Sequence, residues 1–151
     1  GEADDGQLRN INRALQDSAH HFQPFHLTIG DLGCFPNGRS PRVLWLNIRG
    51  AVEQLRALQA KSEKDAILTG FAPEQRAFSP HLTIGRTRRI SRSEQRQLGR
   101  AIQELDSLSE ERQGRPREPL RFEVNQLVLM QSVLEPEGAH YTVLERFTLR
   151  S

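Results

Sequence analysis

A short pattern occurs twice in the chain, and it constrains the fold more than any other feature. Ile11–Leu15 reads Ile-Asn-Arg-Ala-Leu and resembles Leu98–Ile102, which reads Leu-Gly-Arg-Ala-Ile and begins 87 positions later. Around the second copy, residues 81–149 follow the order strand, helix, strand, strand, and around the first copy residues 4–48 follow the order helix, strand, strand. The repeated order predicts an α+β fold with two pseudo-symmetric lobes, each an antiparallel sheet with outer helices.

The expected helices each carry one apolar stripe. Asp4 and Asp5 can cap the first helix, and Ser91 with Glu94 forms a capping box for the last one. A further helix is expected from Ala51 to about Ala66. A helix with a single apolar stripe buries only one face, so we place these helices on the outside of the sheets. The charged segment 107–119 is expected to be a mobile loop.

The repeat also predicts a strand that the chain does not contain. The strand that begins at His81 precedes the last helix, and at the same offset its counterpart before the first helix falls upstream of Gly1. We therefore expect a first lobe without its N-terminal strand. The expected organisation is a single domain over 1–151, with lobe one at about 1–50, lobe two at about 78–151, and a helix and loop at 51–77 between them.

Composition excludes several classes of protein. No apolar run is long enough to cross a membrane, and the acidic first residues do not form a signal peptide. The single Cys34 excludes an internal disulfide framework and fits a reducing compartment, so we expect a cytoplasmic protein. Of the 21 basic residues 19 are arginine, whose planar side chain suits phosphate, although codon bias produces the same preference.

One strand pattern near the middle of the chain has a chemically distinctive face. Leu82 and Ile84 alternate with His81 and Thr83, and we expect the apolar pair to face a core. The other face then carries an imidazole and a hydroxyl about 7 Å apart. An imidazole can transfer a proton near pH 7 while a hydroxyl donates to an anionic oxygen. This pair suits chemistry on a phosphate ester, but a structural strand can carry the same residues.

The wider sequence resembles a known family. The motif His-x-Thr-x at His81–Ile84 is followed by Arg86, and it lies between the segments Arg42–Leu46 and Gln131–Tyr141. This ordered set resembles the two-histidine phosphoesterase superfamily, and within it the bacterial RNA 2′,3′-cyclic phosphodiesterases, also called 2′-5′ RNA ligases. Members carry the motif twice, once in each lobe, on either side of a central cleft. The resemblance extends over essentially the whole chain.

The resemblance implies a reaction and a set of residues for it. The partner would be an RNA end with a 2′,3′-cyclic phosphate, which water opens to a 2′-phosphate and which a 5′-hydroxyl joins in a 2′-5′ linkage. One histidine would act as base and the other as acid, with neither a metal nor another cofactor. The resemblance implies His81 and Thr83 as catalytic residues, Arg86, Ser132 and Tyr141 as substrate-binding residues, and a monomer with no membrane partner.

A second copy of the motif, at His26–Ile29, leaves an alternative open. The pattern after His81 is helical, whereas the pattern after His26 is a turn and another strand. The element order therefore favours a histidine on a strand face for His26, and it predicts that the first family motif is absent from this chain. A catalytic His26 remains the alternative.

Two other functions also remain open. A chain with one of the two motifs fits a non-catalytic module of the same fold that binds RNA or a nucleotide. The same residues fit a phosphodiesterase that acts on a small cyclic nucleotide. A first motif upstream in the gene would favour the enzyme over the binding module.

Overall fold

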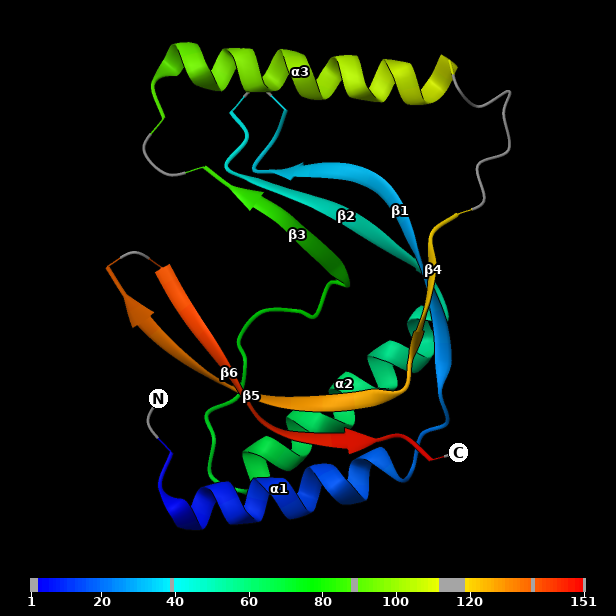
Figure 1. Ribbon diagram of the computed structural model, residues 1–151, viewed down its shortest axis with the longest axis vertical. Helices are drawn as coiled ribbons and strands as arrows, with labels where there is room; N and C mark the ends of the chain where they lie inside the picture. Colours follow the sequence, from blue (N-terminus) through cyan, green and yellow to red (C-terminus); the bar gives the residue numbers. More distant parts are fainter. Residues whose placement is uncertain (1–2, 39, 88–89, 112–118, 137, 151) are drawn as a thin grey trace. The chain divides into compact units, whose positions relative to one another are not determined.

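The computed structural model describes residues 3–38, 40–87, 90–111, 119–136 and 138–150. As the sequence predicts, this part of the chain is an α+β structure with antiparallel strand pairs (Figure 1). Its elements in chain order are α1 (Asp5–Ala19), β1 (Phe25–Phe35), β2 (Val43–Gly50), α2 (Val52–Leu68), β3 (His81–Arg86), α3 (Arg92–Glu111), β4 (Arg121–Val124), β5 (Gln126–Glu135) and β6 (Gly138–Thr148).

The elements fall into two compact units that the chain visits in turn. Unit 1 contains Gly1–His26, Ala51–Phe78 and Glu123–Ser151, and unit 2 contains Leu27–Gly50 and Ser79–Phe122. Each unit is thus assembled from segments that are far apart in the sequence. This grouping differs from the sequential lobes of about 1–50 and 78–151 that the repeat suggests.

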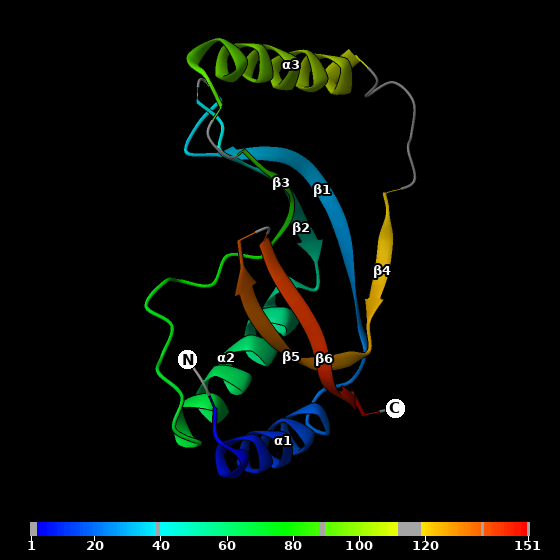
Figure 2. The same cartoon turned by 60° about the vertical axis from the view of Figure 1, so that its left-hand side comes forward.

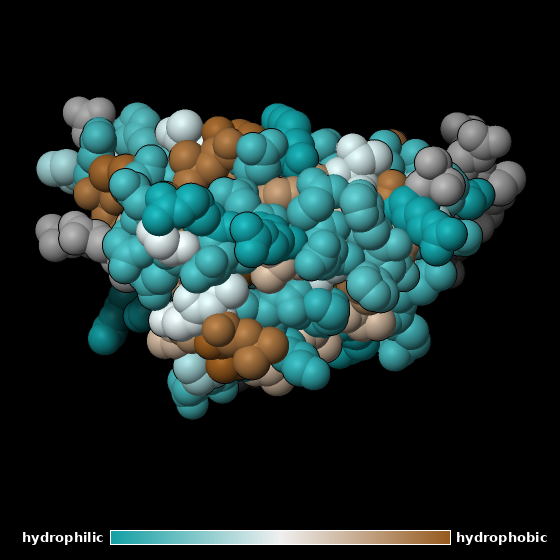
Figure 3. All heavy atoms as spheres, turned by 90° about the horizontal axis from the view of Figure 1, so that it is seen from below, coloured by the Kyte–Doolittle hydropathy of each residue, from teal (hydrophilic) through white to brown (hydrophobic). Residues whose placement is uncertain are grey.

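In unit 1, α1 begins at a capping box and buries one stripe. The Asp4 carboxylate accepts a hydrogen bond from the backbone N–H of Gln7 at 2.7 Å, and the Gln7 side chain accepts one from the Asp4 N–H at 3.3 Å. The predicted apolar stripe is confirmed, since Ile11, Leu15 and Ala19 are buried. The opposite face of α1 is polar, and the side of the molecule on which α1 lies is covered mostly by hydrophilic residues (Figure 3).

A buried polar network joins α1 to α2. Lys61 Nζ lies 2.6 and 2.7 Å from the two carboxylate oxygens of Asp65, and it donates to Ser18 Oγ at 2.9 Å. The Ser18 hydroxyl donates in turn to Asp65 Oδ2. Ser18 is fully buried and Asp65 is 6% exposed. A carboxylate in such a place needs these partners to offset the loss of water.

β5 and β6 form a two-stranded sheet in unit 1 whose two faces differ. The pairing shifts by one residue at Leu144. Strict alternation would place Tyr141, Val143 and Phe147 on one face, but the shift turns Phe147 to the other side. Phe147 is 3% exposed, whereas Tyr141 is 65% exposed. One face of this sheet is therefore buried near Phe147, and the face that carries Tyr141 is open.

A four-stranded sheet, in the order β3-β2-β1-β4, forms most of unit 2. β2 pairs antiparallel with both β1 and β3, and the curvature of these strands is visible in two views (Figures 1 and 2). No helix within the described ranges is long and apolar enough to cross a membrane.

The last helix, α3, also belongs to unit 2. The capping box predicted at Ser91 and Glu94 is confirmed: the Glu94 N–H donates to Ser91 Oγ at 3.3 Å, and the Ser91 N–H donates to Glu94 Oε2 at 2.7 Å. The helix continues to Glu111, further than the predicted loop at 107–119 allows. Residues 112–118 of that loop lie outside the described residues.

Candidate active site

The site predicted around His81 lies on β3, at one edge of the four-stranded sheet. On the neighbouring strand β2, Asn47 lies opposite His81 and Trp45 lies opposite Thr83. Residues directly opposed in an antiparallel pair share a face of the sheet. His81 is exposed and Thr83 is half-buried. The two predicted catalytic side chains therefore stand on one face, together with an amide and an indole.

Arg86 reaches the same face because β3 contains one extra residue. Trp45 lies opposite Thr83, and Val43 lies opposite Arg86. A step of two positions on β2 thus matches a step of three on β3, which defines a β-bulge at Ile84. Strict alternation would have turned Arg86 to the far side of the sheet. The bulge returns its guanidinium to the side of Thr83.

The apolar residues of β3 do not enter a core. Leu82 is 48% exposed and Ile84 is 53% exposed, so the prediction that this pair is buried is wrong. β3 is an edge strand with a neighbour on one side only, and Ile84 is the bulged residue. An edge strand offers fewer contacts to its apolar side chains than a central one.

A hydrogen bond fixes the imidazole of His81. Its Nδ1 lies 2.7 Å from the backbone oxygen of Ser79. A carbonyl oxygen can only accept, so the proton of this bond belongs to Nδ1. In the neutral ring the lone pair is consequently on Nε2, the atom that is left to exchange a proton with a ligand.

An indole borders this imidazole, and a glycine makes room for it. The rings of Trp45 and His81 meet edge to face, with centroids 6.4 Å apart and planes at 71°. Trp45 also lies over Gly33 of β1, because a Cβ atom placed on Gly33 would stand 2.3 Å from Cζ2 of Trp45. We did not predict Gly33 or Trp45 as site residues. A glycine inside a strand pattern is the signal for such a close approach.

The remaining predicted site residues, Ser132 and Tyr141, pair with each other across the β5–β6 sheet. They therefore share a face, and Tyr141 is 65% exposed on it. Both belong to unit 1, whereas His81, Thr83 and Arg86 belong to unit 2.

The second motif lies on β1. His26 is exposed, and its carbonyl oxygen accepts the N–H of Ala51 at 3.1 Å. Thr28 lies opposite Arg49. The predicted element order is confirmed here, since β1 leads into the antiparallel strand β2 while β3 leads into α3.

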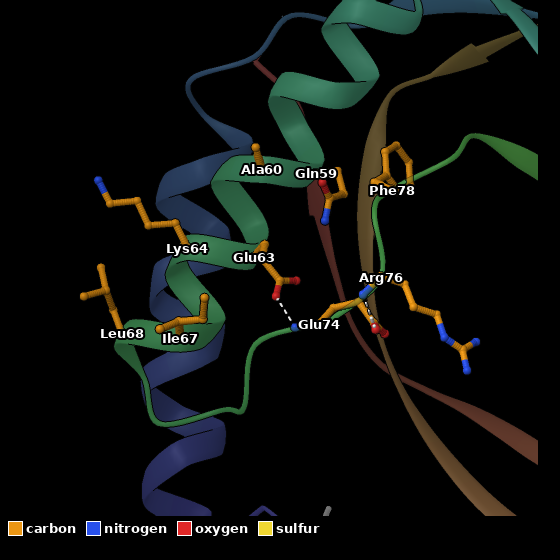
Figure 4. A pocket seen from close by; sticks show the side chains of 9 residues that line it. All are labelled: Gln59, Ala60, Glu63, Lys64, Ile67, Leu68, Glu74, Arg76 and Phe78. Atoms are coloured by element: carbon orange, nitrogen blue, oxygen red, sulfur yellow. Dashed lines mark hydrogen bonds between the residues drawn. The ribbon is translucent and has the colours of Figure 1, made fainter.

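A groove in unit 1 contains none of the predicted site residues. It lies between α2 and the segment 74–78, where the Glu63 carboxylate accepts the N–H of Glu74 at 2.7 Å (Figure 4). Its lining mixes acidic, basic and apolar side chains. Among the described residues that line it, no acidic side chain forms an ion pair with a basic one. The lining residues are Gln59, Ala60, Glu63, Lys64, Ile67, Leu68, Glu74, Arg76 and Phe78.

Solved structures identify the class of fold. The crystal structure of a phosphoesterase superposes on this chain with a TM-score of 0.64 at 22% sequence identity, and the match covers 100% of this chain and 73% of that structure. The apo form of E. coli LigT superposes with a TM-score of 0.63 at 21% sequence identity, and the match covers 100% of this chain and 72% of LigT. The protein TT0787 of Thermus thermophilus superposes with a TM-score of 0.61 at 25% sequence identity, and the match covers 99% of this chain and 74% of TT0787. The fold is that of the LigT-like phosphoesterases.

Sequence comparisons identify the family. The model of the 2′-5′ RNA ligase superfamily matches residues 3–135. A protein of Methanothermobacter thermautotrophicus named RNA 2′,3′-cyclic phosphodiesterase is 32% identical over 149 residues, which are 99% of this chain and 74% of that protein. A protein of the same name from Archaeoglobus fulgidus is 33% identical over 147 residues, which are 97% of this chain and 74% of that protein. This chain belongs to the 2′-5′ RNA ligase superfamily.

Proposed function

We propose that this chain acts as an RNA 2′,3′-cyclic phosphodiesterase, a hydrolase that opens the cyclic phosphate at an RNA end to a 2′-phosphate. The observation that carries the proposal is the imidazole of His81, whose Nδ1–H is bonded to the Ser79 carbonyl at 2.7 Å so that Nε2 is free for proton transfer. Thr83 and Arg86 on the same face support it. The names of the relatives agree with this reaction.

The chemistry requires one proton to leave the nucleophile and one to reach the leaving group. Water attacks phosphorus, the bond to the 3′-oxygen breaks, and that oxygen takes up a proton. His81 Nε2 performs one of these two transfers, and the bond from Nδ1–H to the Ser79 oxygen keeps the proton of the neutral ring on Nδ1. The Thr83 hydroxyl and the Arg86 guanidinium donate to the non-bridging oxygens, where charge accumulates.

The proposal extends to the finer points of the family resemblance. A 5′-hydroxyl that replaces water at the same phosphorus forms a 2′-5′ linkage, so the same groups support a reversible ligase reaction. Ser132 and Tyr141, a cross-strand pair, are proposed to contact the nucleotide, since an exposed tyrosine ring can stack on a base. The proposed setting is a monomer in the cytoplasm.

The test compares kcat of single-residue variants of the protein, with an oligoribonucleotide that ends in a 2′,3′-cyclic phosphate as the substrate. His81→Ala is expected to lower kcat by roughly 10²–10⁴-fold with an unchanged circular dichroism spectrum. His140→Ala is the matched control, because this exposed imidazole lies 3.2 Å from Glu135 in unit 1, and it should retain full turnover.

His26→Ala belongs in the same experiment, because it decides whether this chain supplies the second proton-transfer group. We expect a small effect, in line with a histidine on a strand face. A loss as large as that of His81→Ala, with folding intact, would instead identify His26 as the partner. Full activity of His81→Ala would end the proposal, and RNA binding without any turnover by the unmodified protein would favour the non-catalytic module.

A further inference from the structure

One face of α3 carries a ridge of three arginines, Arg92, Arg96 and Arg100. They follow each other at intervals of four residues, so each stands about 6 Å further along the helix than the last and the ridge spans about 12 Å. All three residues are exposed. None forms an ion pair with a carboxylate whose side chain the structure describes. The ridge therefore presents three exposed guanidinium groups that pair with no described carboxylate.

The arginine ridge is not the face by which α3 packs. Gly99 and Ile102 are buried, and at about 100° per residue their mean direction lies about a quarter of a turn from that of the ridge, with Gly99 next to the line of Arg92. The guanidinium groups are thus free to contact a partner without disturbing the packing of α3.

Helix stability does not explain the ridge. Like charges four residues apart repel each other. The N-terminal half of α3 is rich in arginine and its C-terminal half contains Glu104, Asp106, Glu110 and Glu111, an order that opposes the helix dipole. At the same spacing the α3 row continues to Glu104 and has three basic residues and one acidic residue, a net charge of +2, whereas the α1 row is Asp5, Arg9, Arg13 and Asp17, which is neutral and has an acidic residue first. A local conflict of this kind is expected at functional surfaces.

Charge is divided unevenly between the two units. Unit 2 contains 13 basic and 7 acidic residues, a net charge of +6, while unit 1 contains 8 basic and 12 acidic residues, a net charge of −4. The modest total of +2 hides this asymmetry. A basic unit whose cations are arginines attracts phosphate-rich polymers.

The ridge and the candidate active site are connected within unit 2. β3 runs from His81 to Arg86 and points toward the N-terminal half of α3, where Arg92 begins the ridge (Figures 1 and 2). The bulge at Ile84 keeps Arg86 on the face of His81. The proposed path for an anionic chain begins at His81, passes Arg86 on the same face of β3 and continues toward α3, the next element of unit 2.

We propose that the arginine ridge of α3 binds the phosphodiester backbone of single-stranded RNA whose cyclic end occupies the His81 site. The identity of that end rests on the proposed function, whereas the ridge contacts are independent of base sequence. Its span of about 12 Å covers about three phosphate charges at one per 3.4 Å of strand axis. The ridge makes the enzyme favour RNA chains over cyclic mononucleotides.

The test uses two substrates with the same reactive group, a 2′,3′-cyclic mononucleotide and a ten-residue oligoribonucleotide with the same end. The triple variant Arg92→Gln/Arg96→Gln/Arg100→Gln should lower kcat/KM for the oligomer at least 10-fold relative to that for the mononucleotide. Each lost phosphate contact lowers the slope of log affinity against log salt by about 0.7, so the slope should fall by about 2. Arg9→Gln/Arg13→Gln on α1 is the control with matched spacing and exposure, and it should change neither quantity.

A binding measurement separates this inference from the proposed function. The probe is a fluorescent ten-residue oligoribonucleotide with a 2′-phosphate, which needs no turnover. If the unmodified protein binds it with the ridge-dependent salt slope but hydrolyses nothing, the proposed function fails and the ridge stands. Equal loss on both substrates, an unchanged slope in the triple variant, or equally tight binding of polyglutamate would overturn the proposal.

Discussion

Gly33 controls the surroundings of His81 without touching it. Gly33→Ala places a Cβ atom 2.3 Å from Cζ2 of Trp45, so the indole must leave its edge-to-face contact with His81. We expect the free energy of unfolding to fall by about 1–3 kcal/mol, as for an overpacked site. Under the proposed function we also expect kcat to fall at least ~10-fold with KM little changed, because a proton-transfer group displaced by about 1 Å loses its alignment.

Gly38→Ala is the control for this substitution, since nothing lies within 4 Å of a Cβ atom there. Steady-state kinetics and urea unfolding of both variants provide the comparison. A loss of stability in Gly33→Ala with normal kcat would mean that Trp45 only packs and does not position His81.

At the scale of elements, the link between α1 and α2 depends on Lys61. Lys61→Met removes the cation that bonds both Asp65 oxygens and leaves a carboxylate that is 6% exposed. The lysine side chain is itself 35% exposed, so we discount the cost of an unpaired buried charge to about 1–3 kcal/mol of unfolding free energy. Urea unfolding measures it. Lys64→Met, at an exposed position of the same helix, should be neutral, and an equal effect of both changes would refute the network.

α3 should respond to acid through its cap. The side-chain and backbone hydrogen bonds from Ser91 hold the pKa of Glu94 below its ordinary value of 4.5. A carboxyl whose pKa is lower in the folded state stabilises the fold above its unfolded pKa, and this contribution disappears as the pH falls through the folded pKa. Glu94→Gln should therefore lower Tm at pH 7, and the difference from the unmodified protein should close below about pH 4.5.

The Ser91→Ala variant provides the matching check on this pH dependence. It removes the hydroxyl that donates to Glu94 Oε2 at 2.6 Å, so it should reduce the same acid-sensitive part of Tm. Thermal unfolding monitored from pH 3 to pH 7 records both variants. A constant difference across that range would show that the cap does not depend on the charge of Glu94.

These elements also show what the sequence can and cannot predict. Helix caps depend on residues within about three positions of each other, so the capping box of α3 and an aspartate cap at the start of α1 were predictable from the sequence. The bulges at Ile84 and Leu144 are not, because the partner strand determines register. His81 and Thr83 are two positions apart with no bulge between them, so their common face was predictable. Arg86 and Phe147 lie beyond the bulges, so the face of Arg86 and the burial of Phe147 were not.

At the scale of the whole molecule, the open face of the β5–β6 sheet governs association. It exposes a contiguous set of apolar side chains, and exposed patches of this kind favour association. We expect the chain to associate at high concentration, in contrast to the monomer that the family resemblance implies. The side chains on this face are Val128 at 37%, Met130 at 48%, Leu134 at 86%, Tyr141 at 65% and Val143 at 40% exposed.

Sedimentation velocity over a range of concentrations tests this expectation. Met130 and Val143 lie opposite each other, and the double change Met130→Gln/Val143→Thr should move the distribution toward smaller species. Leu68→Gln replaces a residue that is 74% exposed on α2 and should leave the distribution as it was. A monomer at all concentrations in the unmodified protein would contradict the prediction.

The bulge in β3 has a consequence for tolerance to changes in length. In a strand without a bulge, deletion of one residue moves every later side chain to the opposite face of the sheet. β3 instead holds one residue more than its pairing with β2 requires, and the surplus residue, Ile84, is 53% exposed. Loss of Ile84 would remove the surplus and restore plain alternation. Thr83 and Arg86 would then stand about 3.3 Å closer together along the strand, still on the same side of the sheet.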